Sequence, residues 1–225
     1  EESRVLLRSV KDGTFWPFRL GSGALVVATG GDVKDSDAKS AGGVDISAKD
    51  SKGVGKNPGW LLSSVVIGEM NRYGIMIDLS HASEKSFYDA LELSRLPIIC
   101  SHSSSRALCD HRRNLTDDQM KALAAAGGVA QVCLYSGFIR KDGEATIHDA
   151  VRHIVHMAEV MGTDHIGIGS DFDGGGGIVG LEDASGLTDL TRLLLAEGFS
   201  HDDIWNIWGL NFLQVWEKIR EGRSL

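Results

Sequence analysis

The 225-residue sequence predicts an α/β fold built from parallel strands, and three observations support this prediction. Short apolar runs alternate with longer segments of helical periodicity, and the alternation recurs after about residue 60. Strands joined in this way run parallel, because each helix makes a right-handed crossover between them. Each strand is followed by a polar side chain, namely His81, His102, Tyr135 and Asp171. A barrel gathers such ends on one face, so the pattern favours a barrel over a doubly wound sheet.

The apolar runs predict strands over residues 75–80, 97–100, 129–134 and 165–170, with a further candidate at 23–29. Helical periodicity predicts helices at 84–94, between the Thr116 cap and the Gly127-Gly128 pair, and at 146–161, 187–197 and 202–219. Ser200 is the expected N-cap of the last helix, and Gly209 is expected to break it. These strands fall short of the eight in a full (β/α)8 barrel, so the chain is expected to lack the first units of its fold.

Composition narrows the class of protein. Apolar residues make up 42% of the chain and the formal net charge is -8, which argues against a nucleic-acid partner. No run of about 18 apolar residues occurs, so no membrane span is expected. The three cysteines lack metal-site spacing and are expected to be buried thiols. The length suits one domain over residues 1–225, in which the Gly/Ser/Asp/Lys-rich segment 30–59 is expected to form a long loop.

Two successive strands end in Ser-His, at His81 and His102, and this repetition suggests a metal site. A single histidine after a strand more often makes a hydrogen bond to a loop, but two on consecutive units favour a shared metal ion. Asp171 adds a carboxylate to the same predicted face, directly after a strand and shortly before the four glycines at 174–177. Its alternative role is that of a turn aspartate.

Other polar groups have simpler explanations. His148, His153 and His156 share one predicted helix and are expected on a solvated face. The acids of the segment 201–203 are explained by helix capping. Arg112 and its neighbour Arg113 are either surface charges or ligands for a substrate carboxylate, which suits the fork geometry of a guanidinium group.

Five segments of the chain resemble the membrane (renal) dipeptidase family, which comprises zinc peptidases of the amidohydrolase superfamily. In chain order they are EMNRYGIMIDLSHAS, PIICSHSSSRALCDHRRNLTDD, GVAQVCLYSGFI, HIGIGSDFDG and GLEDASGLTDLTRLLLAEGFS. The resemblance covers about residues 66–218 and is poor before them. It implies a distorted (β/α)8 barrel of the TIM type, apparently without its first units in this chain. It also implies a dipeptidase that is often a homodimer.

The resemblance assigns roles to particular residues. His81 and His102 resemble two histidines that bind one zinc ion. Asp171 resembles an aspartate that exchanges protons with the attacking water and the leaving amine. Arg113 resembles the arginine that holds the terminal carboxylate of a dipeptide, and Phe138 falls where some relatives place a substrate-contacting tyrosine.

The family uses two zinc ions, and the ligands of the second ion are not found in this chain. Counting back from the strand at 25–29 places the bridging carboxylate at Glu2, although the residues around it do not match. No His-x-Asp pair precedes His81, and Thr29 stands where the family has a histidine that contacts the reacting carbonyl.

Two explanations account for these departures. The chain is either a fragment that lacks the front of the barrel or a relative that has lost its dinuclear site. We favour the fragment, because the candidate site residues have little structural reason to occur together. The expected substrate is a small peptide with a free carboxyl end. The alternatives are another amidohydrolase, acting on a cyclic amide or ester, and an inactive relative that binds peptide or metal.

Overall fold

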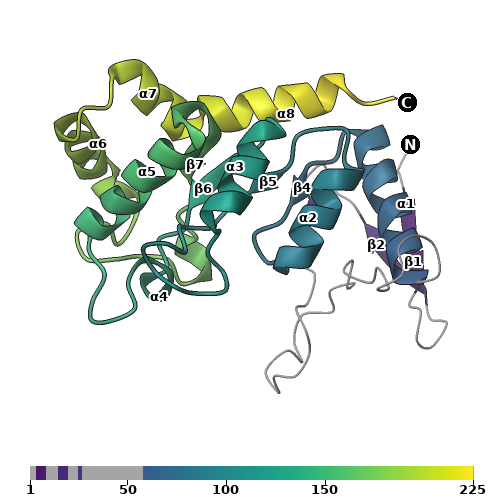
Figure 1. Cartoon of the computed structure of the whole chain (residues 1–225), viewed down its shortest axis with the longest axis horizontal. Helices are drawn as coiled ribbons and strands as arrows, with labels where there is room; N and C mark the ends of the chain where they lie inside the picture. Colours follow the sequence, from purple (N-terminus) through teal and green to yellow (C-terminus); the bar gives the residue numbers. More distant parts are fainter. Residues whose placement is uncertain (1–3, 9–14, 20–24, 27–57, 225) are drawn as a thin grey trace. The chain divides into compact units, whose positions relative to one another are not determined.

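The computed structural model describes residues 4–8, 15–19, 25–26 and 58–224 (Figure 1). They belong to two compact units, one comprising residues 1–95 and 220–225 and the other residues 96–219. The assignment of residues 1–225 to a single domain stays a prediction.

The first unit contains strands of both pairing types. β1 (Arg4–Arg8) pairs antiparallel with β2 (Phe15–Arg19), whereas β3 (Leu25–Val26) pairs in parallel with β4 (Ile77–Asp78). Its helices are α1 (Pro58–Tyr73) and α2 (Glu84–Leu93). The turn after α2 is fixed by Asn71, whose Oδ1 accepts the backbone N–H of Arg95 at 2.8 Å.

The second unit is a parallel α/β structure. β5 (Ile99–Cys100), β6 (Val129–Val132) and β7 (Ile166–Ile168) pair in parallel in that order. The helices are α3 (Asp117–Ala125), α4 (Ser136–Ile139), α5 (Ile147–Met161), α6 (Leu187–Ala196), α7 (His201–Trp205) and α8 (Asn211–Glu221), the last of which runs on into the first unit. Figure 1 shows α3 and α5 together beside β6 and β7. The core between these layers is apolar, and it includes Leu123, Ile154, Met157, Ile166 and Leu190.

The helix boundaries follow the local capping signals. Thr116 accepts the backbone N–H of Gln119 at 3.2 Å, and the Gln119 side chain accepts the N–H of Thr116 at 3.0 Å. Ser200 and Asp203 form the same reciprocal pair at the start of α7. Gly209 has a non-helical φ of 171° inside a π-helical segment between α7 and α8. The predicted caps and the predicted break are therefore confirmed.

Some elements differ from the prediction. The strands are shorter, because the parallel ladders stop before the apolar runs do. α1 was not predicted, since glycine and β-branched residues weaken its helical pattern. It begins at Pro58, so the last residues of the predicted loop 30–59 are helical, as suits proline in a first helical turn. The rest of that loop lies outside the described residues. The β1–β2 hairpin was not predicted either.

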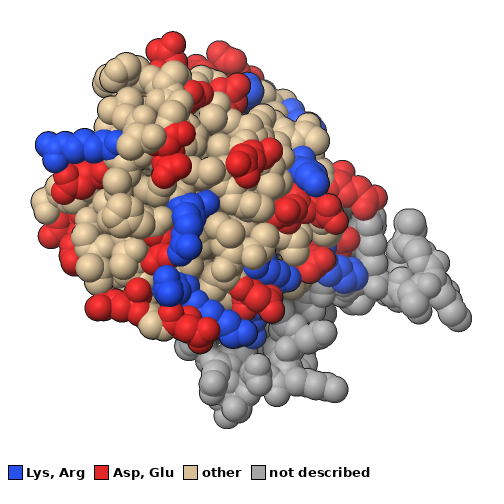
Figure 2. Space-filling view, turned by 60° about the vertical axis from the view of Figure 1, so that its left-hand side comes forward, with Lys and Arg blue, Asp and Glu red and all other residues tan. Residues whose placement is uncertain are grey.

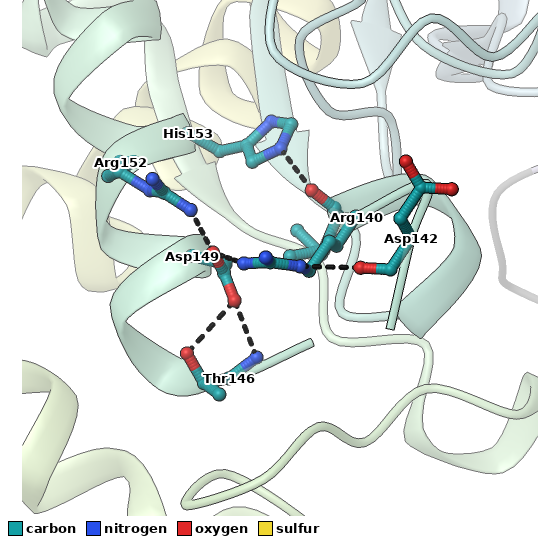
Figure 3. Close-up of polar contacts among 7 residues, drawn as sticks. Arg140, Asp142, Thr146, Asp149, Arg152 and His153 are labelled. Carbon is teal, nitrogen blue, oxygen red and sulfur yellow. Dashed lines mark hydrogen bonds and ion pairs between the residues drawn. The ribbon is translucent and has the colours of Figure 1, made fainter. Parts of the chain in front are cut away.

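The prediction of a solvated face for the helix histidines is wrong for His153, which is 1% exposed. Its Nδ1 accepts the backbone N–H of Ser105 at 3.0 Å. Its Nε2–H donates to the carbonyl of Ile139 at 2.9 Å, the bond drawn from the His153 ring in Figure 3. A ring that accepts at one nitrogen and donates at the other is neutral. Burial lowers the pKa of His153 from 6.5 to about 4.

The start of α5 is fixed by the buried carboxylate of Asp149. Its Oδ2 accepts from the N–H and the hydroxyl of Thr146 at 2.9 Å each, and its Oδ1 contacts Arg140 at 3.1 Å and also Arg152 (Figure 3). Burial opposes ionisation, but the hydrogen bonds from Thr146 and Arg152 outweigh it and lower the pKa of Asp149. The carboxylate therefore stays charged and ties the chain after α4 to α5.

The molecular surface carries charge of both signs. Figure 2 shows one face on which basic side chains lie among acidic ones, without a continuous basic area on that face. The formal net charge of the whole chain is -8. Among the residues that the structure describes, no helix has both the length and the apolar character needed to cross a membrane.

Gly128→Ala should destabilise the protein by about 2 kcal/mol, because the new methyl group would overpack the core. A Cβ at this position would overlap the carbonyl oxygen of Ile98 and lie 2.6 Å from Leu123 Cδ1. Gly68→Ala in α1 is the control, since no heavy atom of the described residues lies within 4 Å of its Cβ position. The control should gain up to about 1 kcal/mol from helix propensity. Urea unfolding measures both changes, and equal stability of the two variants would contradict the packing at Gly128.

Acid should destabilise the fold through His153. With a pKa lowered from 6.5 to about 4, His153 stays neutral in the folded chain while the unfolded chain takes up a proton. The free energy of unfolding should therefore fall as pH decreases through this window, by roughly 3 kcal/mol in total. His153→Gln lacks the titrating group and should show a smaller decrease between pH 7 and pH 4 in urea unfolding. Parallel pH dependence in the two proteins would rule out this contribution.

Candidate functional site

The three strands of the second unit end at one edge of the sheet, and backbone hydrogen bonds join the residues that follow them. Ser103 N–H donates to Gln131 O at 2.8 Å across the ends of β5 and β6. Gly169 N–H donates to Val132 O at 3.0 Å, beyond the end of β7. Leu134 N–H donates to the carbonyl of the residue before Asp171 at 3.2 Å. The segments that carry His102, Tyr135 and Asp171 therefore share this edge, as the sequence predicts.

A glycine allows two of these segments to meet. A Cβ at Gly169 would overlap the carbonyl oxygen of Ser101 and lie 2.9 Å from Gln131 Cβ. Only a residue without a side chain fits between them. Gly169 therefore lets the chain segment that leads to Asp171 pack against Ser101, the residue before His102.

Asp171 has an unusual backbone conformation. Its φ of 60° and ψ of 32° are left-handed, and it is the single non-glycine residue with positive φ in the described parts of the chain. The turn is closed by its carbonyl, which accepts from Gly174 N–H at 3.0 Å and Gly176 N–H at 2.6 Å. A Cβ at Gly174 would overlap Asp171 Oδ1. Strain of this kind is concentrated at functional sites, where it aims a side chain.

Cys133 lies next to the Asp171 carboxylate, with its Sγ 3.9 Å from Oδ2. Burial raises the pKa of Cys133 to about 11, so the thiol keeps its proton near neutral pH. A protonated thiol is a weak donor to the carboxylate and a poor nucleophile. All three cysteines are buried and free, which confirms the expectation from the sequence.

His102 contacts the side chain of its neighbour Ser101. Ser101 Oγ lies 2.8 Å from His102 Nδ1. When Nδ1–H donates to that hydroxyl, Nε2 carries the lone pair through which an imidazole binds a metal. The donor chemistry at His102 therefore fits a zinc ligand.

The remaining predicted metal ligands do not belong to the second unit. His81 belongs to the first unit, where it is exposed in the turn that follows β4 and Asp78. Glu2 and Thr29 lie outside the described residues. Within the described segments, no cluster of three or more His, Cys, Asp or Glu side chains could hold a metal ion.

Arg113 and Phe138 lie together in the second unit. The guanidinium carbon of Arg113 lies 5.3 Å from the centre of the Phe138 ring, a cation–π arrangement. The His111 ring stacks on the same phenyl ring with centres 4.6 Å apart, and the Tyr135 ring lies 4.7 Å from it. The position that a Cβ would take at Gly175 lies 3.5 Å from Tyr135 Cε2, so these rings adjoin the loop after Asp171.

Sequence reasoning missed the part played by His111. Burial, together with the positive charges of Arg112, Arg113 and Arg106, lowers the pKa of His111. Its Nδ1 accepts the backbone N–H of Arg113 at 3.2 Å. The only sequence signal was its place directly before two arginines, which does not reveal the stacking on Phe138.

These groups have side chains suited to three kinds of chemistry in the second unit. Asp171 can move a proton, His102 can bind a metal, and Arg113 on its aromatic support can bind an anion. A metal, a proton-transfer group and an anion-binding group are what hydrolysis of a substrate with a free carboxylate requires.

Comparison with known proteins agrees with this chemistry. Residues 62–224 match the family model described as membrane dipeptidase, peptidase family M19. An uncharacterized dipeptidase of Schizosaccharomyces pombe is 47% identical over 156 residues, which are 68% of this chain and 38% of that protein. Dipeptidase tcpJ of Claviceps purpurea is 38% identical over 158 residues, which are 69% of this chain and 37% of that protein. The chain thus spans less than half the length of these relatives.

Solved structures share the fold. The probable dipeptidase PvdM of Pseudomonas aeruginosa aligns with a TM-score of 0.70 and 27% identity, over 74% of this chain and 55% of that one. A metallopeptidase of Rhodobacter sphaeroides, liganded with a phosphinate mimic of the dipeptide L-Ala-D-Ala, aligns with a TM-score of 0.67 and 32% identity, over 70% and 46%. The predicted TIM-type α/β fold class is confirmed, and the family implies a metal cofactor. The chain belongs to the membrane dipeptidase family, peptidase family M19.

Proposed function

We propose that this chain carries the catalytic groups of a zinc-dependent dipeptidase that cleaves dipeptides with a free C-terminal carboxylate. The observation that supports this function best is that Asp171, with its left-handed backbone, lies on the same strand edge of one unit as His102. Arg113 adds a group that can bind an anion. Its guanidinium lies over the Phe138 ring, which contacts the Tyr135 ring, and Tyr135 in turn adjoins the loop after Asp171. Family membership and the dipeptide mimic bound by the Rhodobacter sphaeroides relative support the same substrate class.

Zinc is the proposed cofactor, with two ions in each active site. His81 and His102 are the proposed ligands of one ion, and Glu2 is the proposed bridging carboxylate. When bound, zinc lowers the pKa of water to about 7 and polarises the scissile carbonyl. The 2.8 Å contact between Ser101 Oγ and His102 Nδ1 supports this role, because an Nδ1–H that donates to the hydroxyl puts the lone pair on Nε2.

Asp171 is the proposed proton-transfer group. A carboxylate oxygen of Asp171 takes a proton from the attacking water while the water oxygen forms a bond to the peptide carbonyl carbon. The same carboxylate oxygen then delivers that proton to the amine nitrogen as the C–N bond breaks. The turn closed by Gly174 and Gly176 fixes the backbone of Asp171, and the Cys133 thiol lies 3.9 Å from its carboxylate.

Arg113 is the proposed anchor for the substrate carboxylate. A guanidinium group binds a carboxylate through parallel hydrogen bonds, which fixes both position and orientation. Phe138, where some relatives have tyrosine, supports the guanidinium through its ring face rather than through a hydroxyl group. The homodimer expected from the resemblance stays a prediction.

Arg113→Ala should raise KM for a dipeptide such as Leu-Ala by about 10- to 100-fold, because charged hydrogen bonds to the carboxylate are lost. The KM for the corresponding dipeptide amide should change little. Arg112→Ala, at the exposed neighbouring residue, is the matched control. Steady-state kinetics of the zinc-loaded protein measures the difference. Equal effects on dipeptide and amide would exclude the anchor and favour an amidohydrolase of another substrate class, and no turnover by the unmodified protein would favour an inactive relative.

His81→Ala and His102→Ala should each remove the same single zinc ion, because two histidines are proposed to share it. Elemental analysis of protein purified without chelator gives the zinc content per chain. Circular dichroism confirms that each variant is folded. His148→Ala changes an exposed histidine of α5 and should leave the zinc content unaltered. Loss of folding with unchanged metal affinity would instead assign both histidines to loop hydrogen bonding.

A further inference from the structure

The four-residue helix α4 cannot satisfy its own C-terminal carbonyls, as is true of every helix end. Three consecutive carbonyls near its end accept hydrogen bonds from side chains outside the helix. The pairs are Cys109 Sγ to Gly137 O at 3.5 Å, Asn114 Nδ2 to Phe138 O at 2.8 Å, and His153 Nε2 to Ile139 O at 2.9 Å. The orientation of α4, which carries Phe138, is therefore set by other parts of the unit.

Two of these donors also bind the loop that contains Arg113. Asn114 Nδ2 lies 2.8 Å from Cys109 O and 3.4 Å from Ser105 O. Ser105 N–H donates to His153 Nδ1 at 3.0 Å. Asn114 is 2% exposed and His153 is 1% exposed, so water does not compete for these bonds. The loop and α4 are thus joined through two buried side chains that the proposed chemistry does not use.

The same two peptide segments meet a second time through their side chains. Arg113 directly precedes Asn114, and its guanidinium carbon lies 5.3 Å from the centre of the Phe138 ring. The His111 ring stacks on the Phe138 ring, and its Nδ1 accepts the backbone N–H of Arg113 at 3.2 Å. A shift of α4 relative to the loop would change the support beneath the guanidinium group.

We propose that Asn114 and His153 are positioning residues that hold Phe138 against the guanidinium of Arg113 and thereby set the selectivity for substrates with a free carboxylate. This inference rests on the proposed role of Arg113 as the carboxylate anchor. A purely structural role would lower stability and affect all substrates alike. A positioning role acts on the carboxylate-bearing substrate in particular.

The test compares variants that keep or lose the hydrogen-bond donors of Asn114 and His153 to the backbone carbonyls of α4. Asn114→Asp keeps the shape of the side chain but loses the donating amide. His153→Gln keeps a donor that can reach Ile139 O, whereas His153→Asn keeps a group near the Nδ1 position and loses that reach. His156→Ala is the matched control, because it lies one turn further on α5 and pairs with Asp117 of α3 instead.

Two measurements report on the position of Arg113. The first is the NMR shift of its side-chain protons in ¹⁵N- and ¹³C-labelled protein, which the ring current of Phe138 displaces. Phe138→Leu supplies the reference without a ring. The second is the ratio of KM for Leu-Ala to KM for Leu-Ala amide in the zinc-loaded protein.

Asn114→Asp and His153→Asn should move the Arg113 shifts toward those of Phe138→Leu and raise the KM ratio about fivefold, with kcat for the amide unchanged. His156→Ala should keep the original shifts and ratio. His153→Gln keeps a donor to Ile139 O but loses the acceptor of Ser105 N–H, so it breaks the link at the loop end and should change the Arg113 shifts in the same direction. If Asn114→Asp does not fold, the two His153 variants still make the comparison with His156→Ala.

Unchanged Arg113 shifts in folded Asn114→Asp and His153→Asn would overturn the proposal, as would equal KM changes for both substrates. The NMR measurement needs no turnover. Altered Arg113 shifts in a protein that hydrolyses neither substrate would therefore support the positioning contacts and overturn the dipeptidase function alone.

Discussion

The second unit depends on how its backbone groups are satisfied once its short strands end. The ladders of β5, β6 and β7 stop after a few residues, although the apolar runs continue. Buried peptide groups beyond the ladders still need partners, because an unpaired buried polar group costs about 1–3 kcal/mol. Side chains supply part of this need. Ser104 Oγ donates to Cys133 O at 3.0 Å and accepts Cys133 N–H at 3.2 Å, and Gln131 Nε2 donates to Ile168 O at 3.2 Å.

The need to pair buried peptide groups also explains why several buried polar residues lie at the strand edge that carries the candidate site. Each strand end is followed by a loop that can turn toward its neighbours only when its peptide groups are paired. His153 is neutral when buried, and the Cys133 thiol keeps its proton, so neither adds an uncompensated charge to the interior. The charged groups of the candidate site, Asp171 and Arg113, are partly exposed. The polar groups that only support the structure are thus buried, whereas the charged groups proposed for the chemistry lie nearer the surface of the same strand edge.

Local sequence patterns predicted those features that local physics determines. The caps at Thr116 and Ser200 and the break at Gly209 follow from a few neighbouring residues, and the structure has all three. The shared edge of His102 and Asp171 followed from the parallel connection of strand–helix units. Resemblance pointed to Arg113 and Phe138 as substrate contacts, and the structure places them side by side, although their roles stay predictions.

Particular side-chain contacts between residues distant in sequence were not predicted. Periodicity placed His153 on a helix, but its burial depends on Ser105 and Ile139, which belong to other segments. The stacking of His111 on Phe138 joins residues 27 positions apart, from 111 to 138, and no local pattern encodes it. α1 was missed for the opposite reason, since its own composition favours a helix only weakly and packing must make up the difference.

The left-handed backbone of Asp171 shows how stability and chemistry compete at one position. An aspartate in this conformation costs about 1 kcal/mol relative to a glycine, which adopts it without a clash between Cβ and the backbone. Redesign of this chain for thermal stability alone would therefore choose glycine at position 171. The most favourable backbone substitution in the loop would thus delete the carboxylate, and any stabilised variant needs this residue fixed before optimisation begins.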